Sequence, residues 1–373
     1  MPCLERDQGH IPKDIPGLFQ HLTAMVARPV SRKEMSANTK AMKAAQNEWN
    51  RLRNKKVWGE TVVRHWSDVC AEARKKHKEI NVGRVFGICV EKGSELAADD
   101  PRRKFKYRVV FQGNNVTNQK WEWALFQDLE SSPASMQAGK CVDSYACFPG
   151  HACQQSDAEQ AYVQAELKGT ETWIALPKEA WPASWFDKKG NPLYDQPVVK
   201  LKKALYGHPD AGTYWEQHCE RAVRSIGFEP VVSWPSCYFH KEWNVLLSVH
   251  VDDFKMSGPE NNLALAWSKL RTHIEMDDPV PAGLYLGCNN HYKTEKDVMK
   301  VTYDMKHYLT TAVEAYQKVC ITATGKRAAL KKVATPFVEE DQLAARAKAP
   351  CAEGPCIQCE WCVRAYFPGQ CKV

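Results

Sequence analysis

The sequence contains no apolar run approaching the roughly 20 residues that a membrane-spanning helix needs. Its N-terminus, MPCLERDQGHIPKDIPGLF, lacks the apolar core of a secretory signal peptide. No internal repeat is present either. These absences argue against a membrane partner and predict an intracellular protein, in a cytoplasmic particle or in the nucleus.

What is present is typical of a folded protein. The 373 residues suit two or three domains, and 44% are hydrophobic and 25% charged. The 15 cysteines are scattered, so most are expected to be reduced and buried. The net charge is +7, and the basic segments RLRNKK, EARKKHK and PRRKFKYR lie close together in the first third of the chain. Such segments indicate either a nucleic-acid partner or a solvated basic face.

The first third of the chain predicts one helix followed by two strands. From about Ala37, the residues Met42, Ala45, Trp49 and Leu52 recur at helical spacing. The segments GRVFGICVEKGSE and RKFKYRVVFQGNN then predict two strands joined by a polar loop. The second alternates aromatic and aliphatic residues with Lys and Arg, which predicts one apolar and one basic face.

Helices and strands continue to mix along the rest of the chain. The segment DAEQAYVQAEL predicts a helix with Asp157 at its N-terminus, and Asp210 is expected to cap a second helix, DAGTYWEQHCERAVRSIGF. TWIALP and GLYLGCNNHY predict strands, and Leu263, Trp267, Leu270 and Ile274 predict another amphipathic helix. The fold class expected from this mixture is α+β, with helices packed on one face of a sheet.

The segment LLSVHVDDFKMSG places two carboxylates, Asp252 and Asp253, at a tight turn between two apolar strands. Neighbouring ionised carboxylates repel each other, and a divalent cation would neutralise them. Most Asp pairs only mark loops, but a loop that served only to reverse the chain would favour Asn-Gly or Asp-Gly, and this turn has neither. The pair therefore predicts a metal site for a phosphate substrate.

A set of segments in fixed order resembles the copia-type LTR retrotransposon reverse transcriptase domain. The segments span about residues 38–337, and each alone is weak. They are AMKAAQNEWNRLRNKKVW, KFKYRVVFQGN, SDAEQAYVQAEL, VVKLKKALYGHPDAGTYWEQ, VHVDDF, LYLGC and VATPF. The resemblance implies a pol polyprotein fragment with a right-hand polymerase shape, consisting of fingers and a palm whose antiparallel sheet is backed by helices. No segment matches ribonuclease H, protease or integrase.

The same resemblance implies domain boundaries. A flexible lead-in is expected at 1–36, a fingers-like region at 37–150 and a palm with the catalytic carboxylates at 151–300. A partial thumb or connection would follow at 301–340, and a Cys-rich, disordered tail at 341–373.

By resemblance, the activity is RNA-directed DNA polymerisation, a nucleotidyl transfer of dNTPs onto a primer 3′-hydroxyl with two Mg²⁺ or Mn²⁺ ions. The partners implied are an RNA or DNA template with its primer, and dNTPs. The metal-binding, catalytic residues implied are Asp157, Asp252 and Asp253. The substrate-binding residues implied are Lys106 and Arg108, which would contact phosphates, and Tyr162, which would lie under the sugar. Gln112 and Lys269 are weaker candidates.

Each assignment has a purely structural alternative. Asp157 would be a helix cap, Tyr162 a core residue, and Lys106 and Arg108 part of a solvated strand face. Two departures from the family pattern, His250 before the Asp pair and Asp210 in place of a Gln, favour a second reading. In it, the chain is a catalytically decayed remnant that keeps the fold and nucleic-acid binding only.

The tail offers a separate possibility. The segment CAEGPCIQCEWC places Cys351, Cys356, Cys359 and Cys362 close together. Four thiolates can bind zinc, which would suggest a zinc-binding interaction protein, although the spacing does not fit a ferredoxin-type iron–sulfur site. The alternative is a tail with no folded role.

Overall fold

The computed structural model describes residues 27–330 except 95, 97, 98, 125, 127–131, 296 and 297. The chain divides into two units, Met1–Tyr316 and Gln317–Val373. The predicted cysteine site and most of the predicted lead-in lie outside the described residues, and the predicted domain boundaries stay predictions. Among the described helices, none is long and apolar enough to span a membrane.

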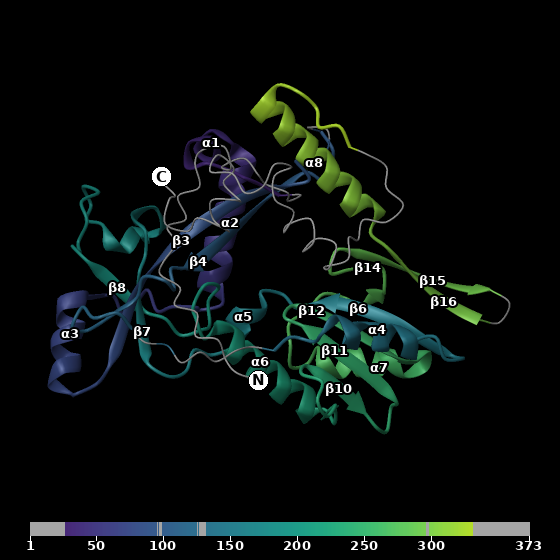
Figure 1. Ribbon diagram of the computed structural model, residues 1–373. Coiled ribbons are helices and arrows are strands. Elements are labelled where there is room, and N and C mark those ends of the chain that lie inside the picture. The colour runs from purple at the N-terminus through teal and green to yellow at the C-terminus, as the bar shows by residue number, and fades with distance from the viewer. Residues whose placement is uncertain are drawn as a thin grey trace, which may run out of the picture. The chain divides into compact units, whose positions relative to one another are not determined.

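The first sheet has seven strands and is organised around the long strand β3. All its pairings are antiparallel except that of β3 with β7. Its strands are β1 (Ala27–Pro29), β2 (Arg64–His65), β3 (Ile80–Lys92), β4 (Lys104–Phe111), β5 (Thr117–Asn118), β7 (Glu171–Ala175) and β8 (Pro197–Lys200). Figure 1 shows β3 and β4 running side by side, with α2 next to them.

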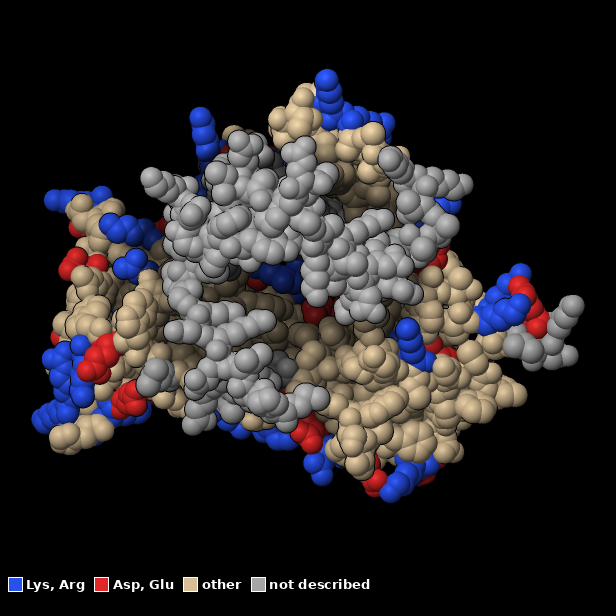
Figure 2. Space-filling view, in the orientation of Figure 1, with Lys and Arg blue, Asp and Glu red and all other residues tan. Residues whose placement is uncertain are grey.

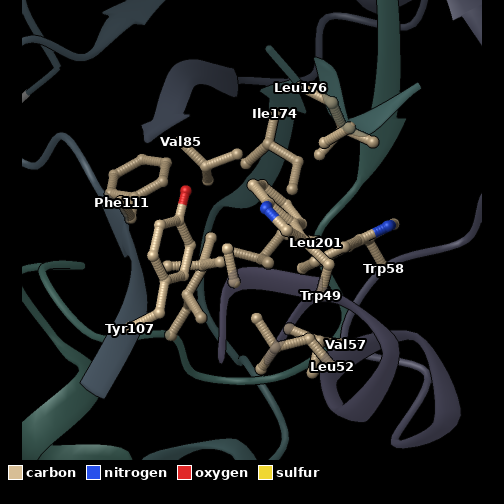
Figure 3. Packing of buried hydrophobic residues seen from close by; sticks show 14 of the residues in the cluster. Trp49, Leu52, Val57, Trp58, Val85, Tyr107, Phe111, Ile174, Leu176 and Leu201 are labelled. Carbon is tan, nitrogen blue, oxygen red and sulfur yellow. The ribbon is translucent and has the colours of Figure 1, made fainter. Parts of the chain in front are cut away.

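Three helices belong to this first part of the chain: α1 (Arg32–Ala37), α2 (Thr39–Asn54) and α3 (Trp66–Lys75). Asn38 caps α2, because its side chain accepts hydrogen bonds from two N–H groups of the first turn. Trp49 and Leu52 of α2 lie in one hydrophobic core with Tyr107 and Phe111 of β4, which Figure 3 shows. The predicted helix and both predicted strands are thus confirmed, and Ala45, Trp49 and Leu52 lie on the buried face of the helix as predicted. Met42, predicted on the same face, is 45% exposed, and Ala41 takes the buried position beside it.

The second sheet has six strands, all antiparallel, in the order β13-β6-β12-β11-β10-β9. The strands are β6 (His151–Asp157), β9 (Glu229–Pro230), β10 (Cys237–His240), β11 (Val245–His250), β12 (Asp253–Pro259) and β13 (Val280–Pro281). Phe254 and Met256 of β12 pack with α6 (Ala211–Ser225) and α7 (Glu260–Leu270). Lys255 between them points to the opposite face, where α4 (Met136–Tyr145) lies. The predicted α+β class with an antiparallel sheet backed by helices is confirmed. The helices were expected on one face of the sheet, but α6 and α7 cover one face and α4 covers the other.

A buried ion pair joins the second sheet to a third. Lys255 pairs with Asp143 of α4, and these side chains are 1% and 2% exposed. The Tyr292 hydroxyl donates to one oxygen of Asp143, and the Tyr303 hydroxyl donates to the other at 2.8 Å. The Lys255 ammonium also lies 4.5 Å from the ring centre of Tyr285. The three tyrosines come from β14 (Leu284–Tyr285), β15 (Cys288–Glu295) and β16 (Val298–Asp304), which form that third sheet.

Helix α8 (Lys306–Thr324) contains the boundary between the two units. In the second unit, the buried Gln317 side chain donates to the carbonyl of Ala328 at 3.0 Å and accepts from its N–H at 2.8 Å. This pair of bonds folds the segment after α8 back onto the helix.

Three predictions about single elements are wrong. Asp157 ends strand β6, and the helix expected there is reduced to one turn, α5 (Ala161–Gln164). Asp210 stands at the N-cap position of α6 but makes no capping hydrogen bond through its side chain. The segment GLYLGCNNHY, predicted as one strand, is divided between β14 and β15 by a turn at Leu286 and Gly287.

Candidate active site

The Asp pair lies on a two-residue hairpin turn with a strained backbone. His250 pairs with Asp253, so Val251 and Asp252 form the loop between β11 and β12. Val251 has a φ of +59°, which hairpin turns of this length require at their first position and which Gly or Asn normally supplies. A β-branched residue there costs about 1–3 kcal/mol, and such strain persists only where surrounding contacts fix it.

Two hydrogen bonds hold this turn. The indole N–H of Trp215, a buried residue of α6, donates to the Val251 carbonyl at 2.7 Å. The N–H of Ala158, directly after β6, donates to the Asp252 carbonyl at 2.7 Å. The turn that carries Asp252 is therefore fixed by a helix and by the end of a neighbouring strand.

Asp157 and Asp253 face each other across the β6–β12 pairing and are hydrogen-bonded through their side chains. Partial burial, followed by the charges of Asp252 and Asp157, raises the pKa of Asp253 to about 6, although His250 opposes the shift. Partial desolvation, followed by the charges of Asp252 and Asp277, raises the pKa of Asp157. The structure thus brings the three predicted carboxylates together, and their negative charges oppose one another.

These carboxylates fit a divalent cation that is shared with a substrate. Across the described part of residues 27–330, no three His, Cys, Asp or Glu side chains are close enough to hold an ion unaided. Mg²⁺ typically binds one or two carboxylates and completes its shell with water and substrate phosphates. The mutual repulsion of Asp157, Asp252 and Asp253 is what such a cation would relieve.

A basic strand faces the carboxylates. Lys106 and Arg108 alternate along β4 with Tyr107 and Val109, which are buried in the same hydrophobic core as Trp49 and Leu52. Burial, with the nearby charge of Arg108, lowers the pKa of Lys106, while the charge of Asp252 opposes this shift. The predicted basic face therefore lies within electrostatic range of the predicted metal site.

Two tyrosines lie between the basic strand and the carboxylates. The rings of Tyr162 and Tyr206 are 4.8 Å apart, and the guanidinium of Arg108 lies 5.0 Å from the centre of the Tyr206 ring. Burial raises the pKa of Tyr162, and the charge of Asp252 acts in the same direction. Four of the other five predicted site residues are thus linked to Asp252 by direct position or by charge, and Arg108 joins them through Tyr206.

The two weaker candidates lie elsewhere. Gln112 follows β4 and lines a surface groove with Arg84. Lys269, in the last turn of α7, lines another groove with Trp243, on the side of the sheet away from α4. The structure does not bring Lys269 to the carboxylates.

Sequence reasoning missed several residues of the site, of which Glu48 is the most informative. Glu48 is buried on α2, and burial raises its pKa. It accepts a hydrogen bond of 3.2 Å from the side chain of Gln160, a residue of left-handed conformation between β6 and α5. Glu48 recurs at helical spacing with the apolar residues Ala41, Ala45 and Leu52, which predicts that it lies on the buried face of the helix. A carboxylate at such a position was a signal that could have identified it.

A family comparison now bears on this geometry. Residues 70–324 match the family model described as reverse transcriptase (RNA-dependent DNA polymerase), and the match includes all three carboxylates, Lys106, Arg108 and Tyr162. The chain belongs to the reverse transcriptase family. Members of this family are nucleotidyltransferases, and reverse transcriptases in general use divalent metal ions.

One solved structure that resembles this reverse transcriptase is telomerase from Candida albicans in complex with a TWJ fragment of telomeric RNA. The two are 10% identical in sequence, with a TM-score of 0.32. The alignment covers 76% of the present chain and 51% of the telomerase chain, so the present chain spans about half of that protein.

The two residues that depart from the family pattern, His250 and Asp210, lie in different surroundings. His250 is half-buried, and its Nδ1 lies 3.1 Å from the carbonyl of Ala134. The Oδ1 atom of Asp210 is buried without a hydrogen-bond partner among the described residues, and burial raises the pKa of this carboxyl. Asp210 therefore adds a poorly solvated acid to the part of the chain that matches the family model.

The raised pKa of Asp253 predicts a pH-dependent effect of Asp253→Asn on the stability of this reverse transcriptase. The folded protein holds the Asp253 proton up to about pH 6, whereas the unfolded chain releases it near the ordinary aspartate pKa of 3.8. The ionised group therefore destabilises the fold increasingly above about pH 4 and fully above about pH 6. We expect the variant to gain about 1–2 kcal/mol at pH 7.5, after allowance for solvent screening, and nothing at pH 4.

Urea unfolding in EDTA at both pH values measures this difference. Asp278→Asn is the matched control, because the side chain of Asp278 is 85% exposed and its ion pair with Arg271 is at the surface. Equal stability of wild type and Asp253→Asn at pH 7.5 would contradict the electrostatic description of the site.

Proposed function

We propose that this chain is the RNA-directed DNA polymerase domain of a copia-type retrotransposon polyprotein. The observation that carries the proposal is the pair of facing carboxylates, Asp157 and Asp253, beside the strained turn at Asp252. Lys106 and Arg108 supply positive charge on the opposite side. Opposed acidic and basic groups suit a deoxynucleoside triphosphate held between metal-binding oxygens and cationic side chains.

In the proposed reaction, a primer 3′-hydroxyl attacks the α-phosphorus of a dNTP, and pyrophosphate leaves. Asp157, Asp252 and Asp253 would hold two Mg²⁺ or Mn²⁺ ions, which supply charge neutralisation at the attacking and leaving oxygens. Arg108 would bind the triphosphate, with its guanidinium oriented by the ring of Tyr206. Tyr162, packed against Tyr206, would lie under the sugar and exclude a 2′-hydroxyl.

Primer extension tests this proposal. Poly(rA)–oligo(dT) with dTTP should be extended by the purified chain in Mg²⁺ or Mn²⁺, and EDTA should abolish the extension. Heat-denatured protein is the control for signal that arises without a folded enzyme. Protein that is folded and binds the primer–template, but extends it with neither metal, would contradict the proposal.

The second candidate function is a remnant that binds nucleic acid without catalysis. It is favoured by Asp210, whose Oδ1 atom is buried without a hydrogen-bond partner in the described part of the chain, because an acid near the triphosphate would oppose nucleotide binding. The same extension assay with Asp210→Gln separates the two, since a decayed enzyme should regain incorporation when this position is restored.

A further inference from the structure

The link, residues 158–161, joins Asp157 to Tyr162 and makes a left-handed turn at Gln160. Gln160 has a φ of +49° and a ψ of +51°, a conformation that is sterically unfavourable for any residue with a side chain. Its carbonyl accepts the Val163 N–H at 3.0 Å and so begins the single helical turn that carries Tyr162. The place of the Tyr162 ring relative to Asp157 therefore depends on how firmly Gln160 is held.

The side chain of Gln160 is held by Glu48. Its amide nitrogen donates to Glu48 Oε2 at 3.2 Å, and its amide oxygen is buried without a hydrogen-bond partner among the residues that the structure describes. Glu48 is a buried residue of α2, and the same helix contributes Trp49 and Leu52 to the core that it shares with β4. The link is thus fixed by a buried carboxylate on a helix that the core keeps in place.

Two further contacts lie on the same side of α2. Glu48, Arg51 and Lys55 are spaced i, i+3 and i+7, which places them on one side of the helix. Arg51 pairs with Glu159 at 3.4 Å, and Lys55 pairs with Glu275. This side of α2 therefore contacts two consecutive residues of the link, and Glu48 makes the second of these contacts.

The two outer pairs contribute less than the buried bond. Arg51, Glu159 and Glu275 are exposed, and Figure 2 shows acidic and basic side chains intermixed over much of the visible surface. Exposed ion pairs of this kind contribute little to stability, because water competes with them. Loss of the bond to Glu48 instead leaves buried polar groups without a partner. Glu48 is therefore the contact that decides how the link is held.

Glu48 also acts on the site through its charge. Burial lowers the pKa of Lys106, and the charge of Glu48 is among those that oppose this shift. Burial raises the pKa of Tyr206 to about 12, and the charge of Glu48 acts in the same direction. The effects of Glu48 thus follow two routes, a hydrogen bond to the link and an electrostatic interaction, which an uncharged hydrogen-bond acceptor at this position separates.

We propose that Glu48 is a positioning residue for sugar selectivity, because it holds Gln160 and so fixes the Tyr162 ring under the sugar of the incoming nucleotide. A ring held in one place excludes a 2′-hydroxyl by contact, whereas a ring that can move away admits it. The hydrogen bond, not the charge, carries this effect. The inference rests on the proposed function, which places the sugar on Tyr162.

Single-nucleotide incorporation of dUTP and of UTP opposite adenosine tests the proposal with the full chain, because the two nucleotides differ only in the 2′-hydroxyl. We expect Glu48→Ala to lower the ratio of kcat/KM for dUTP over UTP by about 10- to 100-fold, as UTP is admitted. Glu48→Gln removes the charge but keeps an oxygen that accepts from Gln160, so its ratio should stay within about threefold of wild type.

Gln160→Ala removes the other partner of the bond. It should lower the ratio as Glu48→Ala does, and the double variant should lose no more than either single variant. Gln46→Ala is the matched control, because it removes a side-chain hydrogen bond of 3.0 Å to Asn50 on the exposed side of the same helix. This control should keep the wild-type ratio.

Three results would overturn the proposal. They are a wild-type ratio in Glu48→Ala or Gln160→Ala, additive losses in the double variant, and a loss in Glu48→Gln equal to that in Glu48→Ala. The last would make the charge the cause. If Glu48→Ala does not fold, Gln160→Ala decides the question, because Gln160 is only half-buried.

Amide hydrogen exchange separates this inference from the proposed function, because it needs no activity. The N–H groups of Val163 and Ala165 are bonded to the carbonyls of Gln160 and Tyr162. We expect both amides to exchange at least about 10-fold faster in Glu48→Ala and Gln160→Ala, and at the wild-type rate in Gln46→Ala. Faster exchange without any incorporation by wild type would refute the polymerase and leave Glu48 as the residue that holds the link. Incorporation with unchanged exchange and an unchanged ratio would refute the positioning role alone.

Discussion

Asp252→Asn should reduce metal-dependent nucleotide incorporation by at least about 1,000-fold, equivalent to about 4 kcal/mol of transition-state stabilisation. Asn keeps the size of the side chain and has one neutral oxygen in place of the carboxylate. The turn itself should persist, because Trp215 and Ala158 hold the backbone carbonyls of Val251 and Asp252, not the carboxylate. Single-nucleotide extension of a primer under saturating dNTP measures the change.

The control is Asp278→Asn, because Asp278 belongs to another adjacent pair of aspartates and lies at the surface. It should extend primers at the wild-type rate. The Asp252→Asn protein should still bind primer–template and unfold at a temperature no lower than wild type in EDTA, since one repelling charge is gone. A variant with more than a tenth of wild-type activity would remove Asp252 from the catalytic assignment.

Asp143→Asn should destabilise the protein by about 3–5 kcal/mol. The substitution leaves the Lys255 ammonium buried without its counter-ion, and the hydroxyls of Tyr292 and Tyr303 lose a charged acceptor. Denaturant unfolding of the full chain at pH 7.5 measures the loss, provided that the transition remains cooperative. The third sheet should be released first, because its tyrosines converge on this carboxylate.

Two variants make the result specific. Glu229→Gln breaks the exposed ion pair with Lys241 and should have no measurable effect on stability. The double variant Asp143→Asn, Lys255→Met removes both charges and should recover much of the loss, because uncompensated burial is the main cost. Equal stabilities of the single and double variants would contradict the role of the unpaired ammonium.

The sequence predicted elements whose signals are local. The helix from Ala37 and the alternating strand of Lys106 and Arg108 were confirmed, because each buries one face against a core that its own periodicity specifies. The hairpin at Asp252 was confirmed for the same reason, since Leu247, Val249, Phe254 and Met256 of its two strands are buried in one core.

Elements defined by distant partners were not predictable in this way. Asp157 lies in a strand because β6 pairs with β12 on one side and β13 on the other, although HACQQSD has little strand propensity of its own. Asp143 meets Tyr292 and Tyr303 across 149 and 160 residues of sequence, and no local pattern marks that meeting. Asp252 and Asp253 were predicted as metal-site residues from the turn itself and Asp157 from the family resemblance, whereas Glu48 and Tyr206 required the packing.

The strained turn has a consequence for recombination between related coding sequences. Its geometry depends on an indole 36 residues earlier in the chain and on a strand end almost 100 residues earlier. A crossover between Asp157 and Asp252 would join a hairpin to a helix and a strand that did not evolve with it. Viable chimeras should therefore inherit this interval as one block.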